Sequence, residues 1–272
     1  MSASSTVTSS ATSKTWLITG CSSGFGSALA LAVLASGDKA ICTACDRSTL
    51  EHLTKRGAVP ISLHLTSDPA VIQAIITNAI TNHGPIDYLV NNAGATMTGT
   101  VESYAPAELQ EHFTINVFSN ITIAQAVLPY MRSQRSGVVA NIGSTAGWGG
   151  GACLGAYSAG RHALAALSLS LGEQVGGFGI TVTCIELGYF CTGILEDGGA
   201  LEVEEVIPEY EDLEGISWEQ GDDSKKVAEL VVEMLSGRGR GVGRAVPGWW
   251  VVGVDAVSLV DAALEGGRWL AL

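Results

Sequence analysis

The chain has 272 residues, of which 47% are hydrophobic and 15% are charged, and its formal net charge is −13. This length suits one α/β domain, and the apolar content excludes a chain that is disordered throughout. The acidic balance, without any cluster of Lys and Arg, argues against nucleic acid as a partner.

No apolar run reaches the roughly 20 residues that a membrane helix needs, and the first residues lack the charged-then-apolar order of a signal peptide. We therefore expect a cytoplasmic protein without a membrane partner. Residues 1–13 are almost all Ser, Thr and Ala without periodicity, which predicts a disordered leader. Residues 14–272 are predicted to form a single domain.

The first motif along the chain is a strand, a glycine-rich turn and a helix. Residues 15–20 indicate a buried strand, residues 21–26 the turn, and residues 27–36 an apolar helix. This order puts backbone amides and the positive end of a helix where a pyrophosphate group can bind. The expected dinucleotide contacts are Gly20, Ser22, Ser23, Gly24, Phe25 and Gly26. A glycine-rich turn needed only for packing is the alternative.

Apolar strands and helices then alternate. The predicted strands are 39–45, 60–65, 86–90, 137–142, 180–186 and 248–254, and the predicted helices are 49–56, 68–83, 106–132, 156–176, 223–235 and 255–264. This alternation predicts an α/β fold with a Rossmann-type doubly wound parallel sheet covered on both faces. Such sheets bind ligands at the carboxyl ends of their strands, where Gly20, Asn91, Ser144 and Leu187 are expected.

Three polar residues follow the strand that ends near Ser144. Tyr157 comes thirteen residues later, and Arg161 lies one helical turn beyond it on the same face. A phenol beside a fixed cation favours the phenolate form, because the opposite charge stabilises it. Such a Tyr can move a proton near neutral pH. The alternative is an ordinary surface Tyr and a helix-surface Arg beside a glycine-rich loop.

From about Trp16 to its end, the chain resembles the single-domain branch of the short-chain dehydrogenases/reductases. The resemblance is carried by T-G-C-S-S-G-F-G at 19–26, N-N-A-G at 91–94, Asn116, Ser144 and Tyr157. It implies hydride transfer with NAD or NADP. Ser144 would hydrogen-bond the substrate oxygen, Tyr157 would donate or remove the proton, and Asn116 would position a water in a proton relay.

The fourth residue of that family's catalytic tetrad is a Lys, and here it is Arg161. An Arg supplies charge and hydrogen-bond donors, but its pKa is too high for it to release a proton. Ser, Tyr and Arg at this spacing also resemble the triad of the halohydrin dehalogenases, which have lost the cofactor glycines that are intact here. Two further departures are Leu187 in place of the usual Pro and His64 in place of the usual Asp.

The expected cofactor is NADP, with NAD as the alternative. The position where NAD-preferring members of the family carry an acid is Ala44, and Arg47 could reach a 2′-phosphate, although Asp46 could take the acidic role. The remaining expected cofactor contacts are Asn92, Ala93, Gly94, Tyr157, Arg161, Gly188 and Thr192. No metal site is expected, because Cys42 and Cys45 lack a second pair of ligands.

The expected partner is a small-molecule substrate. Residues 196–224 hold twelve carboxylates and no Lys or Arg, which in this family would be a substrate lid that could select a cationic compound; a solvated acidic loop is the alternative. Trp148, Cys153, Leu154, the glycine run 149–151 and residues 189–190 suggest an apolar cavity for a bulky, ring-containing substrate.

Two functions therefore remain open. One is an NADP-dependent carbonyl reductase or alcohol dehydrogenase. The other is a non-redox enzyme, an isomerase, cyclase, dehydratase or dehalogenase, in which Tyr157 and Arg161 perform acid–base chemistry. The helices predicted at 106–132 and 156–176 are those that pair between subunits in the family, so we expect a homodimer or homotetramer.

Overall fold

The structure is a computed structural model, and it describes residues 13–188, 200–202, 207 and 223–266. Almost all of the predicted leader and most of the predicted acidic lid lie outside these residues. In the part of the chain that is described, no helix combines the length and apolarity needed to cross a membrane.

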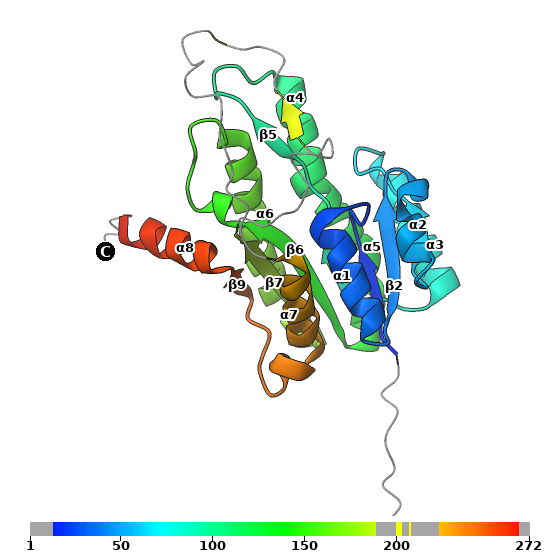
Figure 1. Cartoon of the computed structure of the whole chain (residues 1–272). Helices are drawn as coiled ribbons and strands as arrows, with labels where there is room; N and C mark the ends of the chain where they lie inside the picture. Colours follow the sequence, from blue (N-terminus) through cyan, green and yellow to red (C-terminus); the bar gives the residue numbers. More distant parts are fainter. Residues whose placement is uncertain (1–12, 189–199, 203–206, 208–222, 267–272) are drawn as a thin grey trace, which may run out of the picture.

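A seven-stranded parallel sheet forms the centre of the molecule (Figure 1). Its strands are β1 (Thr15–Ile18), β2 (Lys39–Ala44), β3 (Val59–Ser62), β4 (Tyr88–Asn91), β6 (Gly137–Ser144), β7 (Ile180–Leu187) and β9 (Trp249–Val252). The spatial order is β3-β2-β1-β4-β6-β7-β9, so the direction of winding reverses between β1 and β4. The predicted Rossmann-type fold is confirmed, and the reversal marks the place where such sheets bind ligands.

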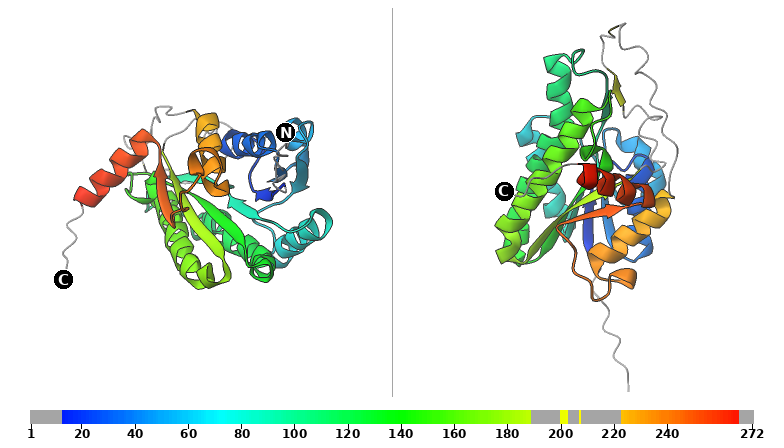
Figure 2. Two further views of the ribbon diagram at one scale, coloured as in Figure 1. Left: turned by 90° about the horizontal axis from the view of Figure 1, so that it is seen from below. Right: turned by 90° about the vertical axis from the view of Figure 1, so that its left-hand side faces the viewer.

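Helices cover both faces of the sheet (Figures 1 and 2). One face carries α1 (Gly24–Ala35) and α7 (Ser224–Ser236), and the other carries α3 (Pro69–His83), α5 (Ser119–Gln134) and α6 (Gly155–Val175). Strand β1 shows why: Trp16 and Ile18 join the core under α1, while Leu17 between them joins the core under α3 and α5. Full burial of such side chains contributes roughly 1.5–3 kcal/mol each.

Local sequence signals set several helix ends. Asp68 caps α3, because its Oδ1 accepts a hydrogen bond of 2.8 Å from the Ala70 amide, and Pro69 occupies the first turn. The short helix predicted at 49–56 is a 3₁₀ turn, η1 (Arg47–Leu50), followed by α2 (Glu51–Thr54). The last helix, α8, spans Val254–Gly266.

The helix predicted over 106–132 differs from the observed structure. It consists of α4 (Pro106–Phe113), a π-helical turn η2 (Thr114–Phe118) and α5. A π-helical turn inserts one residue into the helix, which hydrophobic periodicity does not reveal, and such turns are frequent at functional sites. Here the turn contains Asn116. A small second sheet, β5 (Thr96–Thr98) with β8 (Ala200–Glu202), lies beyond the carboxyl end of β4.

Candidate functional site

The turn after β1 is joined to the turn after β4. Asn92 donates from Nδ2 to the carbonyls of Thr19 (2.9 Å) and Gly20 (3.0 Å), and the Thr19 hydroxyl accepts from the amides of Asn92 and Ala93. Gly20 has φ +69°, and a Cβ there would lie 2.8 Å from the Ala93 Cα. The two turns therefore form one rigid surface at the reversal of the sheet.

The glycines of this turn have two different uses. A Cβ on Gly26 would lie 2.1 Å from the Gly20 carbonyl oxygen, so packing alone requires glycine there. At the amino end of α1, the Ser23 side chain makes no capping hydrogen bond. The first amides of α1 are then available to an anion, and the positive helix end favours one. A dinucleotide pyrophosphate fits this cradle, which Ser22, Gly24 and Phe25 also help to build.

Ser144 is the last residue of β6, at the carboxyl end of the sheet. Its Oγ accepts a hydrogen bond of 3.2 Å from the Ala146 amide and thereby caps a 3₁₀ turn, Thr145–Gly147. A hydroxyl that accepts still has its own hydrogen to donate, for example to a carbonyl oxygen. The Ser144 side chain is half-buried.

Tyr157 and Arg161 lie on one face of α6, as their spacing predicts. The Arg161 Cζ lies 5.0 Å from the centre of the Tyr157 ring, and Nη1 donates to the Ile142 carbonyl at 2.9 Å. Arg161 is only 4% exposed, so the alternative of a helix-surface Arg is wrong. A Cβ on Gly94 would lie 2.5 Å from Arg161 Nη2, which shows that the guanidinium fills the space that this glycine leaves.

Asn116 lies against the same group. A Cβ on Gly94 would also meet Asn116 Oδ1 at 2.8 Å. Nδ2 donates to the Ala95 carbonyl at 2.9 Å and Oδ1 accepts from the Ala95 amide at 3.2 Å, so the side-chain amide pairs with both backbone groups of one residue. The structure thus brings together Gly94, Asn116, Tyr157 and Arg161 at the ends of β4 and β6.

Comparison with known proteins agrees with this geometry. The family model for short chain dehydrogenases matches residues 14–200. The chain is 31% identical over 266 residues to "Oxidoreductase BOA17" of Botryotinia fuckeliana, covering 93% of each protein. A short-chain dehydrogenase from Streptomyces avermitilis has a structure with a TM-score of 0.85 and 35% identity, covering 94% of each chain.

The chain belongs to the short-chain dehydrogenase/reductase family. Its relatives support an oxidoreductase of this type. An actinorhodin polyketide ketoreductase shares the fold, with a TM-score of 0.75 and 24% identity over 92% of this chain and 98% of the other.

Two buried titratable residues beside the site of this short-chain dehydrogenase were missed by the sequence analysis. The first is His112, at the end of α4, which is fully buried. Its Nδ1 lies 3.2 Å from Asn116 Nδ2, and its ring centre lies 6.3 Å from that of Tyr157. Burial, and secondly the charge of Arg161, lower its pKa to about 4. The spacing of four residues from Asn116 is the signal that could have found it.

The second is Glu186, which is 1% exposed at the end of β7. Its Oε1 accepts hydrogen bonds from Trp249 Nε1 at 3.1 Å and from the Cys184 thiol at 3.4 Å. Burial raises the pKa of the carboxyl, while these hydrogen bonds and the charge of Arg161 oppose the rise. A Cβ on Gly143 would lie 2.4 Å from Oε2, so the carboxylate lies directly against β6.

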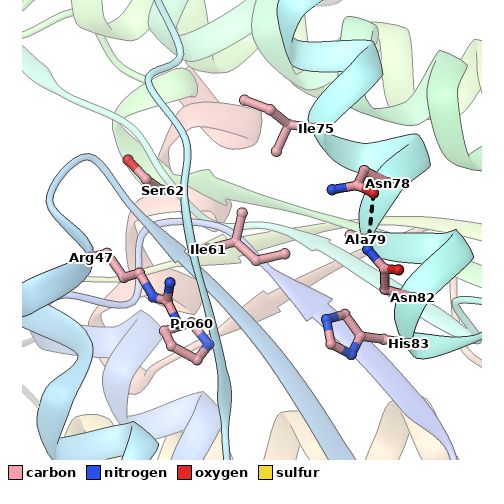
Figure 3. Close-up of a pocket in the computed structure, with 9 residues that line it drawn as sticks. All are labelled: Arg47, Pro60, Ile61, Ser62, Ile75, Asn78, Ala79, Asn82 and His83. Atoms are coloured by element: carbon pink, nitrogen blue, oxygen red, sulfur yellow. Dashed lines mark hydrogen bonds between the residues drawn. The ribbon is translucent and has the colours of Figure 1, made fainter.

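Three residues were expected near the adenosine end of the cofactor, and they follow the strands β2 and β3. Arg47 is exposed and lines a cavity of about 320 Å³ with Pro60 and His83 at the edge strand β3 (Figure 3). Asp46 is engaged locally, since its carboxylate accepts hydrogen bonds from the Ser48 amide (2.8 Å) and hydroxyl (2.7 Å). These bonds lower its pKa. His64 is exposed.

The remaining predicted contacts are described only in part. Gly188 donates to the Val252 carbonyl at 3.1 Å, and a Cβ on it would lie 2.4 Å from Asp255 Oδ1. Thr192 and the apolar pair 189–190 lie outside the described residues. The Trp148 ring packs against the Trp249 ring at a tilt of 41°, with ring centres 4.7 Å apart. Among the described residues, no three His, Cys, Asp or Glu side chains are grouped as ligands for a metal ion.

Proposed function

We propose that this protein is an NADPH-dependent carbonyl reductase that acts on a bulky, apolar small molecule. The observation that carries the proposal is the buried Arg161 cation under the Tyr157 ring, next to a glycine cradle that suits a dinucleotide. Relatives support it: the ketoreductase of the same fold was solved with NADPH, and a further relative, 33% identical over 178 residues, is named a 3-oxoacyl-[acyl-carrier-protein] reductase.

The residues have distinct roles in this reaction. The reduced nicotinamide, when bound, supplies the hydride that adds to the carbonyl carbon. The Ser144 hydroxyl donates a hydrogen bond to the carbonyl oxygen and holds it in place. Tyr157 gives its proton to that oxygen, so that an alcohol forms. The Arg161 cation stabilises the phenolate that remains on Tyr157, because opposite charges attract strongly where water is excluded.

The proposed preference for NADPH rests on the end of β2. Ala44 closes the strand without an acid, and the Asp46 carboxylate is engaged by Ser48. Arg47 follows on an exposed turn, from which its side chain can rotate towards a 2′-phosphate. The substrate class rests on the apolar residues near Tyr157, which include the buried Cys153 and Leu154. A homodimer or homotetramer in the cytoplasm completes the proposal.

The first experiment is a titration of dinucleotide-free protein with NADPH, NADH and their oxidised forms, followed by tryptophan fluorescence. We expect micromolar binding of NADPH, at least tenfold tighter than of NADH. Arg47→Ala should remove that preference, whereas Arg56→Ala, which removes another exposed cation a little further along the chain, should keep it. Bulky ketones are then screened by the loss of NADPH absorbance. Binding of no dinucleotide would refute the proposal.

A non-redox function is the second candidate, and Arg161 is the observation that favours it. Its Nη1 is fixed on the Ile142 carbonyl, and a guanidinium cannot release a proton at neutral pH. Tyr157 would then perform acid–base chemistry beside the fixed Arg161 cation, without net hydride transfer. Product that forms without consumption of reduced cofactor would favour this candidate over the reductase.

A further inference from the structure

His112 lies against three residues at the site, which are Asn116, Tyr157 and Gly160. It is fully buried at the end of α4, between the π-helical turn that holds Asn116 and the helix that holds Tyr157 and Arg161. Its Nδ1 lies beside the Asn116 side chain, four residues along the chain, and its ring packs against Tyr157 of α6. His112 therefore links these two elements.

The hydrogen bonds of Asn116 fix the tautomer of His112. The Asn116 amide pairs with both the carbonyl and the amide of Ala95, which leaves no freedom to exchange its oxygen and nitrogen. The atom that faces His112 Nδ1 at 3.2 Å is consequently the amide nitrogen, which can only donate. One of the two hydrogens on Asn116 Nδ2 goes to the Ala95 carbonyl, and the other is shared between the His112 backbone carbonyl at 3.0 Å and His112 Nδ1 at 3.2 Å. A hydrogen on Nδ1 would face this donor, so the geometry favours a neutral imidazole with its hydrogen on Nε2.

The other side of the imidazole faces α6. A Cβ on Gly160 would lie 3.2 Å from His112 Nε2, and the ring meets that of Tyr157 edge-on with centres 6.3 Å apart. Gly160 precedes Arg161 on the same helix, so the imidazole packs against the part of α6 that carries the Tyr157 ring. A protonated ring would lose its acceptor for Asn116 and add a second cation beside Arg161.

We propose that His112 is a positioning residue: as the neutral Nε2–H tautomer, it holds Asn116 through Nδ1 and supports Tyr157 and Arg161 through its ring. The inference rests on the proposed function only for its effect on turnover. The predicted tautomer and the contact with Asn116 are properties of the folded protein, whatever reaction it catalyses.

Two substitutions test separately the contact of Nδ1 with Asn116 and the packing of the ring against α6. His112→Asn keeps an acceptor near the position of Nδ1 but removes the ring, and His112→Phe keeps a ring but removes the acceptor. His52→Asn is the matched control for the contacts with α4 and α6, because the ring of His52 bonds the Ser27 hydroxyl (2.8 Å) and the Thr49 carbonyl (3.1 Å) and lies on α2. Loss of one positioning hydrogen bond predicts about a tenfold fall in kcat for His112→Phe. NADPH affinity should change less than twofold.

Imidazole nitrogen NMR of the wild-type protein is the decisive measurement, with the His112 signals assigned by their loss in His112→Asn. We expect an unprotonated Nδ1 and a protonated Nε2 at pH 7. The side-chain amide signals of Asn116 should shift in His112→Phe and return towards wild type in His112→Asn. A hydrogen on Nδ1, or an unchanged Asn116 signal in His112→Phe, would overturn the proposal.

Kinetics provides the second arm. A fall of kcat, NADPH affinity and melting temperature together in both variants would mean that His112 only supports the fold, and it would also overturn the proposal. If the wild-type protein reduces no carbonyl with NADPH, the proposed function fails. The NMR arm still decides the role of His112 in that case.

Discussion

Acidification should destabilise this protein through His112. Burial and the nearby Arg161 lower the pKa of His112 to about 4 in the folded state, from 6.5 in the unfolded chain. Between these values the unfolded chain binds one more proton than the folded protein, so the free energy of unfolding falls as the pH falls. The contribution of the neutral imidazole to the free energy of unfolding is fully present above pH 6.5, and it is lost as the pH approaches 4.

The size of the effect follows from the two pKa values. From pH 7 to pH 5, the linkage relation gives a loss of about 2 kcal/mol in the free energy of unfolding for this one group, out of about 3 kcal/mol for the whole fall from a pKa of 6.5 to about 4. Other groups also titrate in this range. The comparison therefore uses His112→Phe, in which every other titratable group is kept and only the imidazole is removed.

The assay is urea unfolding of both proteins at pH 7 and pH 5, followed by tryptophan fluorescence. The wild-type protein should lose about 2 kcal/mol more than the variant between the two pH values. The absolute stability of the variant does not enter, since only the change with pH is compared. Equal losses in the two proteins would mean that His112 titrates near its ordinary pKa, and the assignment of a neutral, buried imidazole would be wrong.

Three further predictions concern the reacting groups. Tyr157→Phe should abolish NADPH oxidation by a ketone, because the phenol supplies the proton. The dissociation constant of NADPH, measured by fluorescence, should stay within threefold of the wild-type value. Residual turnover above one hundredth of wild type would contradict the role of the phenol. Arg161→Lys should keep kcat within tenfold, and Arg161→Gln should lower it at least a hundredfold, because the charge under the ring is kept only in the first variant. Gly94→Ala should lower both stability, by roughly 1–3 kcal/mol, and kcat, because its Cβ would meet Arg161 Nη2 at 2.5 Å. Gly176→Ala is the control, because its Cβ would meet nothing within 4 Å at the far end of α6, and equal behaviour of the two variants would refute the packing argument.

Most of the fold could be predicted because it follows from local patterns. Apolar runs place all seven strands of the large sheet within a few residues of their observed bounds. Two features escape such patterns. The strands β5 and β8 have only three residues each, and they pair across about a hundred residues of chain. The π-helical turn at Asn116 adds one residue to a helix whose periodicity otherwise continues.

Among the residues of the site, too, some follow from local sequence patterns and others do not. Tyr157 and Arg161 were found because four residues on a helix share one face, and the structure shows them in contact. His112 has the same spacing from Asn116, but a single His within a helix carries no further signal. Glu186 meets Trp249 across 63 residues, and no pattern within either segment reveals that pair. Long-range contacts of this kind come only from the packed sheet.

Arg161 is a cation that is almost completely buried. A buried cation is stable only where acceptors and countercharge replace the water that it loses. The Ile142 carbonyl provides an acceptor, and Gly94 provides the space. The buried Glu186 carboxyl lies close enough that the charge of Arg161 acts to lower its pKa, against the rise that burial causes. A neutral His112 avoids a second cation at the same place. The result is a permanent positive charge beside the Tyr157 ring that cannot release a proton at neutral pH. The proton that Tyr157 gives or takes must therefore travel by a route other than the side chain at position 161, and this holds for both the redox and the non-redox chemistry.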